Sequence, residues 1–230
     1  MAFNPKYSSI PMVSDNIGMP DLPIIFPNGV SVPQHLQGDT LQNLYAIGKG
    51  GEQIPFTFVP GAPAYSVTMD ADYKYIALEL TGDLTPSISL PFVVEPSVYP
   101  KKEWCRILAS DTTKYNYPTR PIVVFFKAFQ RKIEQQNVVV KYDDEVGTII
   151  PLSQKQFDVL TFTTQPMNSD YARLLLDIAE WDNVTFQYWD TKTNGWSTAL
   201  KVAKKAESWQ KTTYPKTLGT TIQGSFVIKQ

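Results

Sequence analysis

The sequence predicts an all-β protein, an antiparallel and jelly-roll-like β-sandwich with an extended, Pro-rich N-terminal arm, and three observations support this class. The residues enriched in strands, Thr, Val, Ile, Tyr, Phe and Trp, account for 84 of the 230 residues, whereas Ala numbers only 13. From residue 54 onward, apolar and polar residues alternate with the period of two that is typical of half-buried strands. About ten such segments follow at intervals of 8 to 12 residues without repeating helical crossovers, which favours a sandwich or barrel over a parallel α/β sheet.

Residues 1–45 are expected to form the arm, because proline is concentrated at this end of the chain. Nine of the 18 prolines fall within the first 63 residues, a stretch with only six charged residues. Proline fixes φ and biases the preceding residue toward extended geometry. The segment is nevertheless too apolar for a free tail. Its apolar residues are candidate contacts either with the chain's own core or with a neighbouring subunit: Ile24, Ile25, Phe26, Leu36, Leu41, Leu44 and Tyr45.

Residues 46–230 are expected to form a single β-sandwich domain, a size that one domain accommodates. Each strand is predicted from alternation and from the turn residues that bound it, and residues 121–129 are the most apolar segment and the expected central strand. Asn194-Gly195 is a strong hairpin signal because both residues tolerate positive φ. In chain order the expected strands are residues 54–59, 73–80, 87–94, 104–109, 121–129, 137–142, 146–152, 157–164, 184–189, 196–202 and 224–229.

Residues 171–180 fit two secondary structures. A helix would place an apolar face opposite three charged residues and could begin at a cap on Ser169. A strand would turn at residues 181–183 into the next strand. We slightly favour the strand because the neighbouring segments are all predicted to be β.

Composition and charge exclude several classes of function. One His and one Cys nearly exclude His-based metal sites, Cys-rich zinc sites and disulfides. The net charge of −1 offers no basic surface for phosphate neutralisation, so strong direct nucleic-acid binding is not expected. The N-terminus has no apolar core of a secretory signal, and no apolar run approaches the roughly 20 residues of a membrane helix.

No catalytic constellation stands out, and the chain is not expected to be an enzyme or to hold a cofactor or metal. His35 is the only candidate base, and it lies in a Pro/Gly-rich segment without a Gly-x-Ser-x-Gly motif anywhere in the chain. Cys105 sits in an apolar stretch and is expected to be a buried small hydrophobe. Residues 47–52 lack the spacing of a phosphate-binding loop.

Aromatic residues are concentrated in the hairpin that the Asn-Gly turn closes. Tyr188, Trp189 and Trp196 could form an exposed platform for sugar faces or for a protein partner. The alternative, which we favour, is that these rings fill the core, where aromatic side chains supply much of the buried area.

With its arm (residues 1–45), its start without a signal and its strands between residues 54 and 228, the chain resembles structural proteins of viruses and bacteriophages built on jelly-roll-like sandwiches. The resemblance implies a capsid, minor capsid or neck-and-tail subunit, made in the host cytoplasm and assembled in the virion with copies of itself and other structural proteins. The weakly negative charge departs from capsid proteins with basic genome-binding arms. The alternative is a carbohydrate-binding or receptor-binding β-sandwich that uses the aromatic platform.

Overall fold

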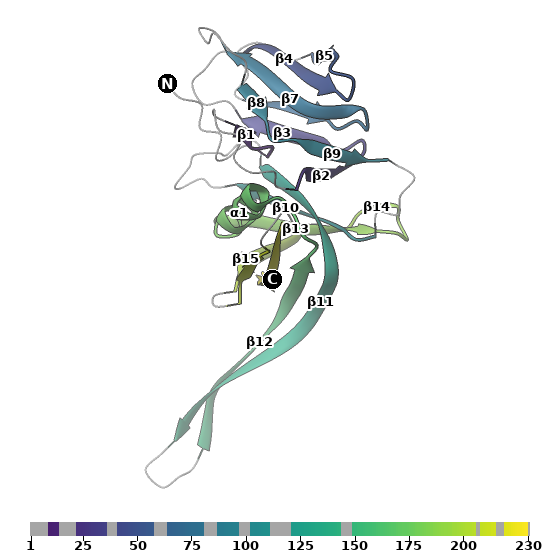
Figure 1. Cartoon of the computed structure of the whole chain (residues 1–230). Coiled ribbons are helices and arrows are strands. Elements are labelled where there is room, and N and C mark those ends of the chain that lie inside the picture. The colour runs from purple at the N-terminus through teal and green to yellow at the C-terminus, as the bar shows by residue number, and fades with distance from the viewer. Residues whose placement is uncertain are drawn as a thin grey trace.

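A computed structural model of the chain describes residues 9–13, 22–35, 41–57, 64–80, 87–96, 102–110, 121–143, 149–205, 208–214 and 219–229. Within these ranges it contains 17 strands and one helix, which confirms the predicted all-β class. The N-terminal strands gather at one end of the molecule, the C-terminal strands form its centre, and a two-stranded ribbon extends from the other end (Figure 1).

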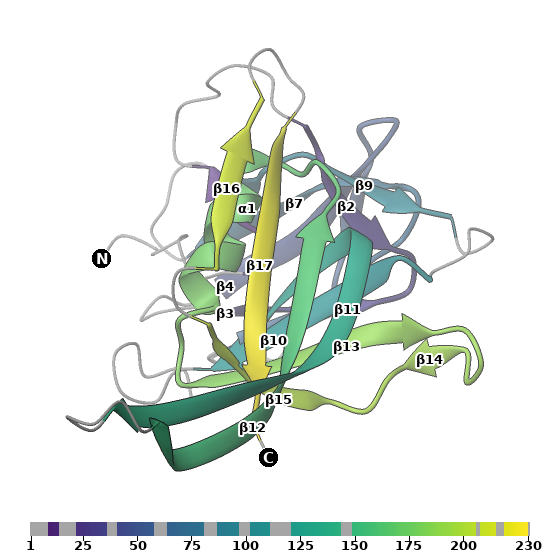
Figure 2. The same cartoon turned by 90° about the horizontal axis from the view of Figure 1, so that it is seen from below.

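Six strands of the C-terminal half close into an antiparallel barrel (Figure 2). In order around the barrel they are β10 (Trp104–Ser110), β11 (Ile122–Asp143), β12 (Ile149–Thr164), β17 (Thr220–Ile228), β15 (Leu200–Lys204) and β13 (Asn183–Asp190). The ring closes because β13 pairs with both β15 and β10. The sequence predicted two facing sheets here, and it could not distinguish them from a barrel because both architectures alternate buried and exposed residues along each strand.

Aromatic rings fill the barrel interior. Four buried rings have centroids 5.3–6.5 Å apart and come from four of the six strands: Phe126, Phe162, Phe186 and Phe226. Trp209, just before β16 (Gln210–Thr213), adds a fifth ring 5.0 Å from Phe226. Its indole lies against Gly224, where a Cβ atom would meet the ring at 2.8 Å, so the close approach requires a residue without a side chain.

The N-terminal half forms three smaller sheets. The first has the order β1 (Met12–Val13), β8 (Ser87–Ser89), β7 (Tyr73–Leu80), β4 (Leu41–Gly48) and β5 (Gln53–Pro55). A parallel pair joins β2 (Ile24–Pro27) to β9 (Phe92–Glu95), and an antiparallel pair joins β3 (Ser31–His35) to β6 (Ala64–Thr68). Most of their buried apolar side chains belong to the same hydrophobic core as those of the barrel.

The described part of residues 1–45 is therefore paired with strands of its own chain, and these residues do not form a free arm. Five of the candidate contact residues are buried, Ile25 is half-buried, and Leu36 lies outside the described residues; the buried five are Ile24, Phe26, Leu41, Leu44 and Tyr45. Phe26 shows the physical reason, because its ring lies 5.6–6.2 Å from the rings of Phe92, Phe125 and Tyr171. The expected boundary between residues 45 and 46 falls inside β4.

Residues 169–178 form a helix, α1 (Ser169–Ile178), so the slight preference for a strand in this region was wrong. The N-cap is Asn168, one residue before the expected Ser169, and its side-chain oxygen accepts hydrogen bonds from the backbone N–H groups of Asp170 and Tyr171. The apolar face predicted for the helix is buried. A local cap and a face with helical period therefore outweigh the β-rich surroundings.

The hairpin after α1 contains the predicted turn. β13 ends at Asp190 and pairs with the two-residue strand β14 (Gly195–Trp196), with Trp189 opposite Trp196. Asn194 has a φ of 49°, the positive value that the Asn-Gly signal predicted.

Candidate functional site

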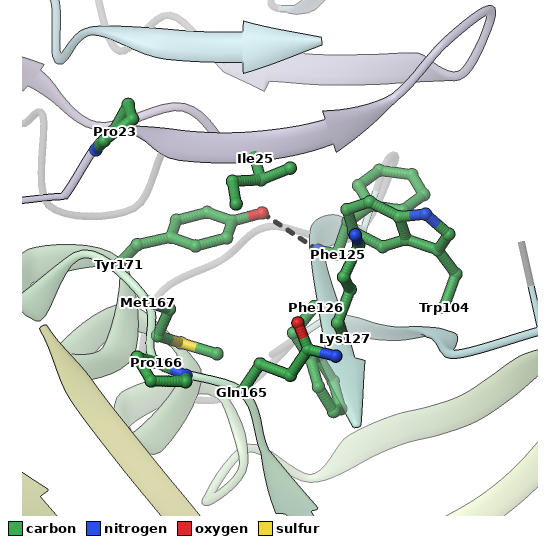
Figure 3. Close-up of a pocket in the computed structure, with 10 residues that line it drawn as sticks. All are labelled: Pro23, Ile25, Trp104, Phe125, Phe126, Lys127, Gln165, Pro166, Met167 and Tyr171. Carbon is green, nitrogen blue, oxygen red and sulfur yellow. Dashed lines mark hydrogen bonds between the residues drawn. The ribbon is translucent and has the colours of Figure 1, made fainter. Parts of the chain in front are cut away.

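A small hollow lies between β2 and the barrel (Figure 3). It offers about 30 Å³ of room, enough for a water molecule and far below the ~300–1,000 Å³ of a small-molecule pocket. Its lining is largely apolar and comes from the start of β2 and the residue before it, from β10 and β11, from the connection between β12 and α1, and from α1: Pro23, Ile25, Trp104, Phe125, Phe126, Lys127, Gln165, Pro166, Met167 and Tyr171.

The polar groups around this hollow already have partners within the chain. The backbone N–H of Phe125 donates to the hydroxyl of Tyr171 at 2.9 Å, and burial raises the pKa of that hydroxyl. Lys127 forms an ion pair with Glu95. The hollow is therefore a seam between the N-terminal sheets and the barrel, where two layers pack against each other.

The residues considered for catalysis are not brought together. His35 lies in β3 and Cys105 in β10, which belong to different sheets. In the part of the chain that the structure describes, no group of three or more His, Cys, Asp and Glu residues is placed to hold a metal ion. The one helix among these residues, ten residues long, is too short to cross a membrane.

Cys105 is completely buried in the barrel, as its apolar neighbours predicted. Burial raises the pKa of its thiol to about 11, although Arg131, whose Nη1 lies 3.7 Å from Sγ, acts in the opposite direction. Because the thiolate is the reactive form, we expect native Cys105 to resist iodoacetamide at pH 8 and to react fully in urea. Intact-mass spectrometry measures both, and fast labelling of the native protein would contradict the burial.

The three aromatic residues of the predicted platform are half-buried and packed against other side chains. Trp189 and Trp196 meet edge to face, with ring centroids 5.5 Å apart at 85°. The guanidinium of Arg106 lies 4.4 Å from the Trp196 ring, and that of Arg131 lies 3.9 Å from the Tyr188 ring. The rings therefore do not form a row of parallel flat faces.

Hydrogen bonds hold the platform hairpin onto the barrel. Gln187 accepts from Nε and Nη2 of Arg106 at 3.0 and 2.8 Å, and its own Nε2 donates to the carbonyl of Ser197 at 2.6 Å. Burial lowers the pKa of Arg106. The contacts of Arg106, Gln187 and Ser197 therefore have a structural role, which is to fix the hairpin on the barrel.

A protruding ribbon is the strongest candidate for a functional surface. β10 pairs with β11 only as far as Lys127, and β17 pairs with β12 only from Val159 to Thr163. Beyond these points, over residues 130–143 and 149–158, β11 and β12 pair only with each other among the described residues. From residue 135 of β11 onward the two strands are also beyond β17 and curve away from the body (Figure 1). At about 3.3 Å per residue, the β11 part of this ribbon is about 45 Å long.

A β-bulge marks the base of the ribbon. The pairing of β11 with β12 shifts between Ala128 and Gln130, which leaves Phe129 without a partner residue. A bulge bends its strand and increases the local twist, and the ribbon departs from the barrel at this point.

The ribbon and its base carry solvent-exposed apolar side chains. Phe129 is 65% exposed, Ile133 49% and Val138 46%, and they are three of the six exposed large hydrophobic residues among those that the structure describes. Among the described residues, no further strand pairs with either edge of the ribbon, so the backbone groups of both edges are available to another strand. An apolar, open-edged projection of this kind is typical of a contact surface.

The sequence predicted the strands of the ribbon but not the ribbon. It divided β11 into residues 121–129 and 137–142, and β12 into residues 146–152 and 157–164, because the polar stretches between them resembled turns. One signal was available: no Gly or Pro occurs between Pro121 and Gly147, so the stretch has none of the usual residues that end a strand.

Comparison with known proteins identifies no relative: no family model, no curated protein and no solved structure matches this chain.

Proposed function

We propose that this chain is a structural subunit that works through protein–protein contacts in an assembly of many copies, and that the β11–β12 ribbon reaches a neighbouring subunit. The ribbon is the observation that carries the proposal. It has two open edges and three exposed apolar side chains, and in the described residues no third strand supports it beyond the barrel.

The energetics of an isolated ribbon support this assignment. A two-stranded hairpin without a third strand or a packed face is at best marginally stable in water. The ion pair between Lys132 and Glu134 adds little, because both side chains are exposed. Contact with a neighbour would cover the apolar side chains and satisfy the backbone groups of an edge at the same time.

In this proposal the assembly is a virion, and the subunit is a capsid, minor capsid or neck-and-tail component that acts without catalysis. This setting, and a jelly-roll-like arrangement of the sheets, rest on the resemblance of the sequence to viral structural proteins. The net charge of −1 favours protein partners over direct contact with the genome.

A second candidate is a carbohydrate-binding or receptor-binding module that uses Tyr188, Trp189 and Trp196. The edge-to-face packing of the two indoles favours it less than the assembly role, because sugar rings stack on exposed flat faces. Loss of glycan retention on replacing Trp189 with Ala, with the mass in solution unchanged, would favour this candidate.

Shortening the ribbon tests the assembly role. In the variant, Asn-Gly replaces residues 135–158, so that Glu134 and Val159, which are paired in the full chain, flank a two-residue turn. We expect the full chain to elute with a mass that is a multiple of 25.9 kDa and the shortened chain to be a monomer, as measured by size-exclusion chromatography with light scattering.

Circular dichroism and thermal unfolding serve as the control, because the six paired strands of the barrel are retained in this variant. A full chain that stays monomeric at its highest soluble concentration would refute the proposal. So would a shortened chain that is folded and keeps the mass of the full-chain oligomer.

A further inference from the structure

One edge of β11 pairs with β12, and the opposite edge, here called the outer edge, pairs with β10 only in its first part. β10 pairs with β11 as far as Lys127, and the backbone N–H of Ala128 donates to the carbonyl of Glu103 at 2.9 Å. From Gln130 onward, no strand of the described residues pairs with this edge. The ribbon curves away from the barrel beyond this point (Figure 1), so the backbone groups of the edge are accessible to another strand.

We propose that this edge pairs with the same edge of a second copy, in an antiparallel and two-fold symmetric contact centred on Ile133. The inference rests on the proposed function and names the partner and the register of the ribbon contact. In this register Ile133 lies opposite the partner's Ile133, and Lys132 lies opposite the partner's Glu134. By symmetry, Glu134 lies opposite the partner's Lys132.

Symmetry restricts the registers that such a contact can adopt. Residues directly opposite each other in an antiparallel pair point to the same face of the sheet. A two-fold axis perpendicular to the sheet keeps every residue on its own face, and successive residues alternate between the faces. Only registers that place one residue opposite its own copy therefore satisfy both conditions.

Charge selects among these registers. Centring the contact on Arg131, Lys132 or Glu134 places like charges opposite each other at the axis. Centring it on Gln135 or Gln136 brings no opposite charges together. Among centres from residue 131 to residue 136, only Ile133 gives two opposite-charge pairs and opposes no like charges. Cross-strand pairs of opposite charge stabilise a sheet and like pairs destabilise it, so within residues 131–136 Ile133 is the centre at which the edge is complementary to itself.

The same register accounts for the exposed apolar residue at its centre. Ile133 is half-exposed on an otherwise polar stretch of β11, where Lys132 and Glu134 flank it with largely exposed side chains. Opposite its own copy, each Ile133 side chain covers the other. A second copy thus supplies both the apolar and the ionic complement of this edge.

Charge reversal tests the register. We expect Lys132→Glu and Glu134→Lys, each alone, to raise the dissociation constant of the dimer about tenfold, because each opposes like charges twice. The double variant restores both pairs and is expected to return to within about twofold of the natural chain. Mixing the two single variants is also expected to restore association, because one then carries two Glu residues and the other two Lys residues at these positions.

Sedimentation velocity at low salt measures the natural chain, the two single variants, the double variant and the mixture, and circular dichroism confirms that each is folded. Equal dissociation constants for the single variants and the natural chain would overturn the register. Weakened single variants that the double variant and the mixture fail to rescue would overturn it as well.

A cysteine at the axis provides an independent readout. Ile133→Cys places two thiols directly opposite each other, within the range in which mild oxidation forms a disulfide-linked dimer on a non-reducing gel. Gln135→Cys is the matched control, because the partner's Arg131 lies opposite residue 135 in this register. Cys105 does not interfere, since it is completely buried.

Cross-linking of Gln135→Cys but not of Ile133→Cys would overturn the register. The proposed function would still stand if shortening the ribbon abolishes the oligomer. An oligomer that survives the shortening refutes the proposed role of the outer ribbon but leaves the register to the charge-reversal and cysteine variants, because the shortened chain keeps Lys132, Ile133 and Glu134.

Discussion

Replacing Phe125 with Ala is expected to lower the free energy of unfolding by about 3–5 kcal/mol, the usual cost of truncating a buried phenylalanine. Phe125 lies on the outer face of the barrel and is buried between it and the N-terminal sheets. Its ring lies 6.2 Å from the ring of Phe26 and 5.7 Å from that of Trp196. The truncation would enlarge the hollow that the ring already lines, because pairing with β10 and the hydrogen bond from the Phe125 N–H to the Tyr171 hydroxyl hold the backbone in place.

Phe129→Ala is the matched control, four residues further along the same strand. Its ring is largely exposed at the bulge, so the same truncation is expected to change the free energy of unfolding by less than about 0.5 kcal/mol. Urea denaturation followed by tryptophan fluorescence measures both variants. A loss below about 1 kcal/mol for Phe125→Ala would mean that the two halves of the molecule do not depend on this contact.

Most strands could be predicted from local sequence, because alternation and turn residues are local properties. The segments expected at residues 73–80, 104–109 and 184–189 coincide closely with β7, β10 and β13. Closure of the barrel could not be predicted in this way. It depends on β13 pairing with β10, which is separated from it in the sequence by β11, β12 and α1.

In the N-terminal segment the local geometry was predicted, whereas the sequence left its packing partner open. Proline does hold this part of the chain extended, and Pro27, Pro33 and Pro55 all lie in short strands of the N-terminal sheets. Such strands tolerate proline because each lies at an edge, where a missing N–H donor can face away from the partner strand. Extended geometry was therefore predictable, whereas the choice between the chain's own core and a neighbour depended on the packing of Phe26.

The ribbon was missed for a related reason. Apart from Ile133, residues 130–136 are polar on both faces, so they lack the alternation that identifies a half-buried strand. Their strand structure comes from pairing with β12, for example Arg131 with Phe162 and Glu134 with Val159. The platform residues, in contrast, were placed correctly in one hairpin, and the sequence could not show that Arg106 would cover the ring of Trp196.

Gly219→Ala is expected to lower the free energy of unfolding by about 2–4 kcal/mol, because two separate costs combine. Gly219 has a φ of +74°, a conformation that an alanine adopts only with strain. A Cβ atom there would also lie 2.5 Å from Cδ1 of Leu22 and 2.7 Å from the carbonyl oxygen of Met167. That oxygen accepts a hydrogen bond from the N–H of Thr220 at 2.8 Å, so it cannot withdraw without breaking the bridge between the start of β17 and the segment before α1.

Gly29→Ala separates the two costs. Gly29 has nearly the same φ, +73°, but a Cβ atom there would meet nothing within 4 Å, so only backbone strain of about 1–2 kcal/mol is expected. Urea denaturation of the two variants measures the difference, which isolates the contact with Met167 and Leu22. Equal losses of unfolding free energy for Gly219→Ala and Gly29→Ala would mean that the backbone bridge between Met167 and Thr220 can shift without a loss of stability. The start of β17 would then not be fixed against the segment before α1.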